Sequence, residues 1–271
     1  MTILLADIGG THARLAYLNA GKIGCMTVFD CGDFKTPIKL LETFVQKKRL
    51  SGIVLSVAGP TERGRVQWSN RPNWKLSESE LKRRFNLKKS LIVNDMVAQG
   101  YGLKLPQNRK ALLMNVGTGM GSSLILNGIV YPCEFGLVLS KMNYKQEYLI
   151  SGQGIVRIYH GLDGDKTIRS AKLLDELRYQ GDKKAIQSYK NFYELWGATA
   201  GNIATGLMVS HVYLWGGLIP KNKKDMQDFL KAFHNPKLPK FNQKISVKVV
   251  REKSLALKGL AYLSKYGFSQ P

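Results

Sequence analysis

The chain has 271 residues, of which 44% are hydrophobic and 22% charged, and it carries 41 Lys and Arg against 19 Asp and Glu. These fractions are typical of globular proteins and exclude the disordered and fibrous classes. The longest apolar stretches fall short of the roughly 20 residues of a membrane-spanning helix. The N-terminus has no basic segment and includes Asp7, which argues against a signal peptide. We therefore expect a folded, cytoplasmic protein.

The net charge of +22 raises the question of a nucleic-acid partner. The basic residues are scattered, however, mostly at expected helix ends and loops, without the interleaved aromatic residues of a single-strand binding surface. We interpret them as a solvated basic surface with no dedicated nucleic-acid site. The three cysteines, Cys25, Cys31 and Cys133, are too few for a disulfide framework, and no Cys-x-x-Cys or His-Glu-x-x-His spacing predicts a protein-bound metal.

The first half of the chain predicts a β-meander followed by alternating helices and strands. Turns at Gly9-Gly10 and Asn19-Ala20-Gly21 divide the meander into its strands. Strands are expected over residues 3–7, 13–18, 25–29, 52–57 and 90–93, and helices over 37–48, from Ser77, and from the strand end at 94–95 to about residue 103.

The second half begins with another hairpin, over residues 111–116 and 122–126, whose turn is glycine-rich. Further helices are expected over 154–160, 167–180, 182–206, 223–233 and 254–265, with strands over 211–214 and 245–250. Both halves place Gly and Thr just after an apolar strand, which is a weak internal repeat. The pattern predicts two α/β domains, residues 1–104 with 254–271, and residues 105–253.

Two glycine-rich turns are candidate phosphate sites. In the first, Gly9 and Gly10 allow close backbone approach, Thr11 can donate a hydrogen bond, and Asp7 can orient hydrated Mg²⁺. The second is Gly117-Thr118-Gly119, which is neither a Walker loop, because no Gly-Lys-Ser/Thr follows, nor a dinucleotide fingerprint, because a strand follows it. An ordinary hairpin turn is the alternative at both positions.

Three further groups of residues are candidates for sugar or nucleotide contacts. Asn94 and Asp95 end an apolar strand, where α/β folds present catalytic groups, although Asp95 could simply cap the next helix. Glu134 and Glu147 lie in apolar or glycine-rich sequence, and buried carboxylates need partners such as sugar hydroxyls. Gly216-Gly217 is either a flat surface for an adenine ring or a plain strand-to-helix turn.

Taken together and in order, these motifs resemble the bacterial glucokinase family, over nearly the whole chain. The resemblance rests on Asp7-Ile-Gly-Gly-Thr-His-Ala-Arg, Ser69-Asn70-Arg-Pro-Asn-Trp74, Ile92-Val-Asn94-Asp95, Gly117-Thr-Gly119, Pro132-Cys-Glu134, Glu147-Tyr-Leu-Ile-Ser-Gly-Gln-Gly and Gly216-Gly217. It implies a two-lobed actin/hexokinase-like (ribonuclease H-like) fold with the active site in the interlobe cleft. It also implies ATP and Mg²⁺ as cofactors, a homodimer, and phosphorylation of a hexose, glucose first, at its 6-hydroxyl.

The same resemblance implies a role for each candidate residue. Asp95 is the base that receives the proton of the sugar hydroxyl. The residues that hold the sugar are Asn70, Asn94, Glu134 and Glu147, those around the phosphates are Asp7, Gly9, Gly10, Thr11, Gly117, Thr118 and Gly119, and those beside the adenosine are Gly216 and Gly217.

The chain departs from the family after Glu134, where Phe135-Gly136-Leu137 replaces the usual Gly-Gly-His. The imidazole that would contact the sugar near C1 and C2 is therefore missing, and Leu137 stands in its place. This change favours an alternative function, a non-catalytic or altered-specificity sugar-binding regulator built on the same fold. A repressor of the related kinase and repressor family would need a helix-turn-helix before the first phosphate motif, and only six residues precede Asp7.

Overall fold

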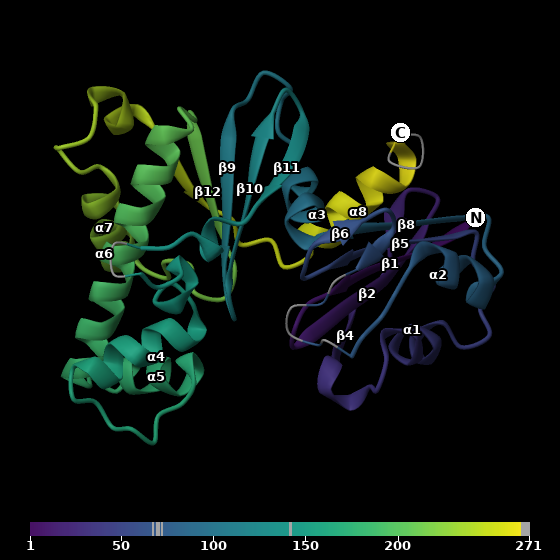
Figure 1. Ribbon diagram of the computed structural model, residues 1–271, viewed down its shortest axis with the longest axis horizontal. Helices are drawn as coiled ribbons and strands as arrows, with labels where there is room; N and C mark the ends of the chain where they lie inside the picture. Colours follow the sequence, from purple (N-terminus) through teal and green to yellow (C-terminus); the bar gives the residue numbers. More distant parts are fainter. Residues whose placement is uncertain (67, 69–70, 72, 141–142, 267–271) are drawn as a thin grey trace. The chain divides into compact units, whose positions relative to one another are not determined.

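The computed structural model describes residues 1–66, 68, 71, 73–140 and 143–266. Its contacts divide the chain into two compact units, Met1–Pro106 together with the C-terminal segment from Glu252, and Gln107–Arg251 (Figure 1). Each unit contains its own β-sheet and its own helices. Within the described part of the chain, no helix is long and apolar enough to cross a bilayer.

The first unit is built on a six-stranded sheet with the order β3-β2-β1-β5-β8, in which β4 also pairs with β2. Its strands are β1 (Thr2–Ile8), β2 (His12–Asn19), β3 (Lys22–Ile23), β4 (Thr27–Asp30), β5 (Gly52–Val57) and β8 (Lys89–Asn94). Strands β1, β2 and β4 pair antiparallel, which confirms the predicted meander, whereas β1, β5 and β8 run parallel. A separate short ribbon joins β6 (Thr61–Glu62) to β7 (Arg65–Val66).

Helices cover both faces of this sheet. The four are α1 (Pro37–Val45), α2 (Glu78–Phe85), α3 (Asp95–Gly102) and α8 (Leu255–Tyr266), and one turn of 3-10 helix spans Cys31–Asp33. Leucines of α1 and α2 are buried on one face, and leucines of α8 are buried with Ala98 of α3 on the other. The α3 and α8 backbones touch, since a Cβ on Gly259 would lie 1.7 Å from the carbonyl oxygen of Ala98.

The second unit has a five-stranded sheet with the order β11-β10-β9-β12-β13. Its strands are β9 (Ala111–Val116), β10 (Met120–Leu126), β11 (Ile129–Cys133), β12 (His211–Trp215) and β13 (Ser246–Val249). Strands β9, β12 and β13 are parallel, and β10 and β11 extend the sheet as an antiparallel hairpin. Strand β11 was not predicted, because it contains Pro132, a residue that only an edge strand accommodates.

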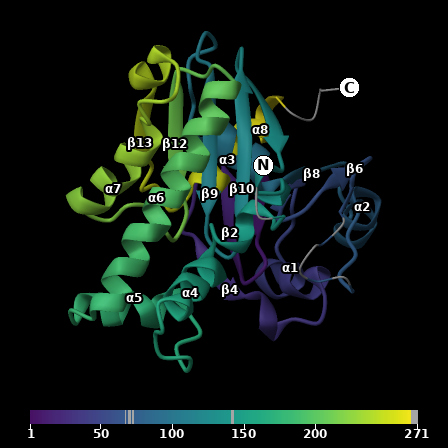
Figure 2. The same cartoon turned by 60° about the vertical axis from the view of Figure 1, so that its left-hand side comes forward.

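Helices α6 and α7 lie beside this sheet in both ribbon views (Figures 1 and 2). The helices of the unit are α4 (Gly152–Gly161), α5 (Ala171–Tyr179), α6 (Lys183–Gly206) and α7 (Lys223–Phe233), with turns of 3-10 helix at Phe135–Leu137, Gln146–Tyr148 and Lys240–Lys244. The buried stripe of α6 recurs at helical spacing and includes Tyr189, Phe192, Tyr193 and Trp196. This aromatic core holds α6 against the sheet and against α7.

Candidate active site

The first unit brings two of the predicted motifs to one edge of its sheet. The register of the parallel strands aligns Ile8, Val57 and Asn94 in a single row. The chain therefore leaves β1 and β8 at the same edge, which places the Gly9-Gly10-Thr11 turn and Asp95 along it. This is the carboxyl edge, where parallel α/β sheets present their functional groups.

Asp7 is a buried carboxylate, only 4% exposed, in the row before that edge. The strand register places it between Arg14 and Ser56. Ser56 Oγ donates to Asp7 Oδ1 at 2.7 Å, and Arg14 Nη1 donates to Asp7 Oδ2 at 3.4 Å. Burial nevertheless raises the pKa of Asp7, because desolvation outweighs the lowering effect of these partners. The sequence prediction missed Arg14 and Ser56, although the strand register of the hairpin would have indicated the first.

The first glycine turn is tight and is braced by an arginine. The Gly9 N–H donates to His12 O at 3.0 Å, and Arg71 Nε donates to Gly10 O at 3.1 Å. Thr11 is exposed, so its hydroxyl is available to a ligand. Arg71 is a further cation beside the candidate phosphate turn. Asn70, the predicted sugar contact of the same segment, lies outside the described residues.

Asn94, and not Asp95, caps α3. Its Oδ1 accepts from the Met96 N–H at 2.9 Å, and its Nδ2 donates to Gly59 O at 3.1 Å. Asp95 is the first residue of the helix and is partly exposed, with Oδ1 also 2.9 Å from the Met96 N. Asn94 is the N-cap residue, and the Asp95 carboxylate accepts from the same N–H, so both residues contribute to the start of α3. The sugar contact of Asn94 stays a prediction.

In the second unit the Gly117-Thr118-Gly119 turn follows β9 and the Gly216-Gly217 turn follows β12, which is the neighbouring strand of the sheet. Strands β9 and β12 are parallel, and Asn115, the residue before the last of β9, pairs with Trp215, the last residue of β12. Gly216 has a φ of +113°, and a Cβ there would lie 2.4 Å from Val116 O, so this position requires glycine. A Cβ on Gly117 or Gly217 would meet no atom within 4 Å. Space for a ligand therefore borders both turns.

The structure also brings the two predicted glutamates to the Gly117-Thr118-Gly119 turn. A Cβ on Gly119 would lie 2.9 Å from Glu147 Oε2, so this carboxylate abuts the turn. Glu134 is an exposed residue, but partial desolvation still raises the pKa of its carboxyl, and the charge of Glu147 raises it further. Glu134, Glu147 and the second phosphate turn thus form one cluster within the unit. Leu137 follows in the turn Phe135–Leu137 and is 45% exposed.

We expect Glu134→Gln to weaken sugar binding while slightly stabilising the fold at pH 7. The folded pKa of Glu134 is raised, so its charged form destabilises the folded protein above that pKa. The stabilisation is below about 0.5 kcal/mol, because the side chain is partly solvated, and it disappears as pH falls through this pKa. Because the family resemblance implies that Glu134 holds a sugar hydroxyl, the KM for glucose should rise up to about tenfold, since the amide replaces a charged acceptor with a neutral one.

The measurements are KM for glucose and the midpoint of thermal unfolding between pH 4 and pH 8. Glu176→Gln on α5 is the control, because it removes an exposed carboxylate far along the chain from the cluster. A sugar KM that stays at the wild-type value in Glu134→Gln would remove Glu134 from the sugar site.

The residues present fit a magnesium nucleotide. Asp7 is a hard oxygen donor, and each of its oxygens keeps a lone pair after bonding Ser56 and Arg14. Among the described residues no three His, Cys, Asp or Glu side chains gather in one place. Mg²⁺ commonly takes only one or two carboxylates together with substrate phosphates, so a single carboxylate suffices.

Comparison with known proteins identifies the family and the fold. The family model described as Glucokinase matches residues 4–129 and 140–266, which leaves out the segment that holds Glu134 and Leu137. A glucokinase of Helicobacter pylori strain J99 is 30% identical over 80% of this chain and 81% of its own.

Two solved structures share the fold over 97% of this chain. A glucokinase from Balamuthia mandrillaris in complex with glucose has a TM-score of 0.80 at 20% identity and is covered over 93% of its length. A ROK family glucokinase from Streptomyces griseus in complex with glucose and AMPPNP has a TM-score of 0.78 at 18% identity and is covered over 99%.

These findings define the class first: the chain has the actin/hexokinase-like α/β fold and is a sugar kinase, as predicted. The chain belongs to the glucokinase family. The resemblance inferred from the ordered motifs is therefore confirmed.

Proposed function

We propose that this protein transfers the γ-phosphoryl group of ATP to the 6-hydroxyl of glucose, with Asp95 as the base. The observation that carries the proposal is the pairing, at one sheet edge of a glucokinase-family chain, of the Gly9-Gly10-Thr11 turn with Asp95. The sugar oxygen bonds to the γ-phosphorus as the bond from that phosphorus to the β-phosphate oxygen breaks. ADP leaves, and the hydroxyl proton passes to the Asp95 carboxylate.

The remaining residues position the two substrates. Phosphoryl transfer leaves little covalent chemistry to the protein, so orientation and charge stabilisation supply most of the rate. We assign the sugar hydroxyls to Asn70, Asn94, Glu134 and Glu147, the phosphates to Gly9, Gly10, Thr11, Gly117, Thr118 and Gly119, and the adenosine to Gly216 and Gly217.

Asp7 would hold hydrated Mg²⁺, which when bound neutralises charge on the phosphates. Arg14 and Ser56 keep the Asp7 carboxylate oriented, through the contacts described above. We further propose that the two units act as domains that close on the sugar, with the active site in the cleft between them, and that the protein works as a cytoplasmic homodimer.

The test is ADP release from purified protein with ATP, Mg²⁺ and a panel of hexoses. Glucose should support turnover, and product analysis should place the phosphate on the 6-hydroxyl. The alternative, a regulator without catalysis, is favoured by Leu137 and by the unmatched segment around it. Sugar binding that shifts the melting temperature with no ADP release from any hexose would establish that alternative.

We expect Leu137→His to lower the KM for glucose. A leucine makes no hydrogen bond, and one neutral hydrogen bond to a sugar hydroxyl changes affinity roughly 2- to 10-fold. The gain should be smaller for 2-deoxyglucose, which lacks the 2-hydroxyl. Leu139→His is the matched control, because Leu139 is also exposed, at 57%, but follows the 3-10 turn. A gain of equal size for both sugars would place the new contact elsewhere.

A further inference from the structure

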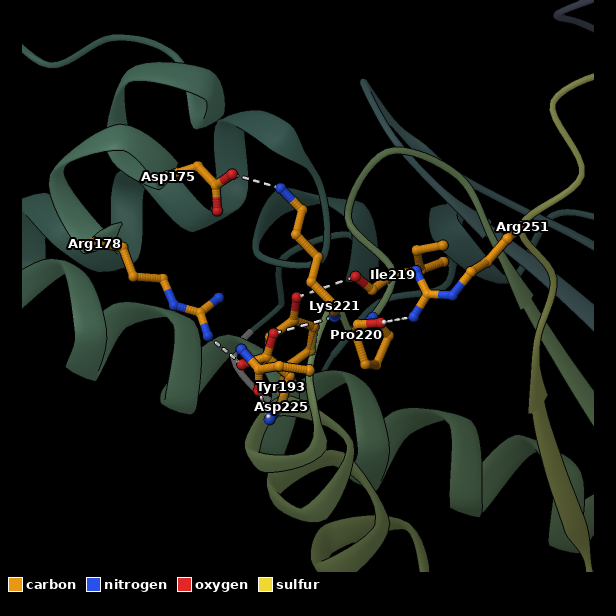
Figure 3. Close-up of polar contacts among 9 residues, drawn as sticks. Asp175, Arg178, Tyr193, Ile219, Pro220, Lys221, Asp225 and Arg251 are labelled. Carbon is orange, nitrogen blue, oxygen red and sulfur yellow. Dashed lines mark hydrogen bonds and ion pairs between the residues drawn. The ribbon is translucent and has the colours of Figure 1, made fainter. Parts of the chain in front are cut away.

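The loop between β12 and α7, residues 216–222, is held through its backbone at three successive residues (Figure 3). The bonds run from Tyr193 Oη to Ile219 O at 3.3 Å, from Arg251 Nη2 to Pro220 O at 3.2 Å, and from Lys221 N to Asp225 Oδ2 at 3.1 Å. The donors and acceptors come from α6, from the segment after β13 and from α7. Three separate parts of the unit therefore fix one half of this loop.

Asp225 can accept from the loop because the Arg178 guanidinium compensates its charge. Its side chain is 3% exposed, and its other oxygen, Oδ1, pairs with the Arg178 guanidinium of α5. That guanidinium lies 4.3 Å from the ring centre of Tyr189. An unpaired buried carboxylate would be strongly destabilising. Arg178 therefore acts on the loop through Asp225, and Lys221 adds a second link to α5 by pairing with Asp175.

The other half of the loop carries the Gly216-Gly217 pair. The Leu218 N–H donates to Val116 O at 3.2 Å, which joins the loop to the end of β9, just before the Gly117 turn. Two consecutive glycines have more backbone freedom than any other pair, so binding a ligand on them would require ordering them. Strand β12 before the glycines, and the bonds of Leu218 and of residues 219–221 after them, leave the glycines ordered in advance.

We propose that Tyr193, Arg251 and Asp225 are positioning residues for the nucleotide: by holding residues 219–221 they keep Gly216 and Gly217 in the conformation that binds the adenosine part of ATP. The inference rests on the proposed function, because that function assigns adenosine to the two glycines. Pre-organisation of this kind raises affinity by removing an ordering cost from the binding step.

The test uses Tyr193→Phe, Arg251→Met and their combination in the full chain, with Kd for ATP in the absence of sugar measured by calorimetry. Each single variant should raise the Kd and the KM for ATP roughly 2- to 10-fold, and the double variant should raise them more than either. The kcat and the KM for glucose should stay within about twofold of wild type, because the proposed function assigns this loop to the adenosine and not to the sugar or the transferred group. Asp225 is left intact, since its loss would leave Arg178 without its partner.

Two controls match these variants. Ser188→Ala removes another buried hydroxyl of α6, one that donates to Lys184 O, and Lys248→Met removes an exposed cation of β13. Both should leave the Kd for ATP unchanged. Variants that fold and turn over glucose with an unchanged Kd for ATP would overturn the inference and leave the proposed function standing. A weakened Kd for ATP in protein that phosphorylates no hexose would support the inference and remove the proposed function.

Discussion

Replacement of Asp95 by Asn is expected to lower kcat by about 10²–10⁴ while leaving sugar binding close to that of the wild type. This range is the usual loss when a general base is removed, and an amide keeps the shape of the side chain without accepting the hydroxyl proton. The capping bond of α3 comes from Asn94, so the helix should still form in this variant. The measurements are kcat by coupled ADP release and the Kd for glucose by calorimetry.

Asp33→Asn is the control for this variant, because Asp33 is an exposed acid of the same unit and lies in the 3-10 turn Cys31–Asp33. Its kcat should equal that of the wild type. Turnover of Asp95→Asn within a few fold of the wild type would contradict the assignment of the base, whatever the effect on sugar affinity.

Gly259→Ala is expected to destabilise the first unit by about 3 kcal/mol, at the upper end of overpacking. The added Cβ would lie 1.7 Å from Ala98 O and 2.9 Å from the Gly102 N, and both are backbone atoms that cannot rotate away. Helices α3 and α8 would have to separate, which would expose leucines that they bury together with the sheet. Urea unfolding should show a lower transition midpoint for this unit.

Gly206→Ala, in contrast, is expected to raise the midpoint of urea unfolding. Gly206 ends α6, and a Cβ there would meet no atom within 4 Å. Alanine should stabilise the fold by about 0.4–1 kcal/mol by restricting the unfolded chain. Equal midpoints for Gly259→Ala and wild type would mean that α3 and α8 do not approach as closely as described.

Local sequence signals predicted most of the fold. Helix α7 lies at the predicted Lys223–Phe233, because its apolar spacing and its Asn222 cap agree. Helix α5 begins later than predicted, at Ala171, because Ser170 Oγ accepts from the Leu173 N–H and fixes the start there. Helix α1 ends earlier than predicted, at Val45, where Gln46 takes a positive φ of 51°. The exact ends of a helix depend on such capping bonds and backbone angles, which the spacing of hydrophobic residues does not reveal.

The residues of the candidate site could be predicted only where they belong to a recognisable sequence motif. The glycine turns and Asp95 could be located because each follows an apolar strand. Partners that depend on strand register or tertiary packing could not: Asp7 meets Ser56 from 49 residues away, and Tyr193 meets Ile219 from 26 residues away. No local sequence pattern predicts pairs that lie so far apart in the chain, because these pairs depend on which strands and helices become neighbours.

The close contact between α3 and α8 also bears on how the protein folds as it is made. The sheet of the first unit is complete once β8 has been synthesised, but α8, which covers one of its faces together with α3, follows the entire second unit in the sequence. Synthesis proceeds at roughly 5–20 residues per second, so that face of the sheet lacks α8 while the ribosome makes the entire second unit. The second unit, continuous in sequence, can close its core first, and the first unit becomes fully folded only after α8 has been made.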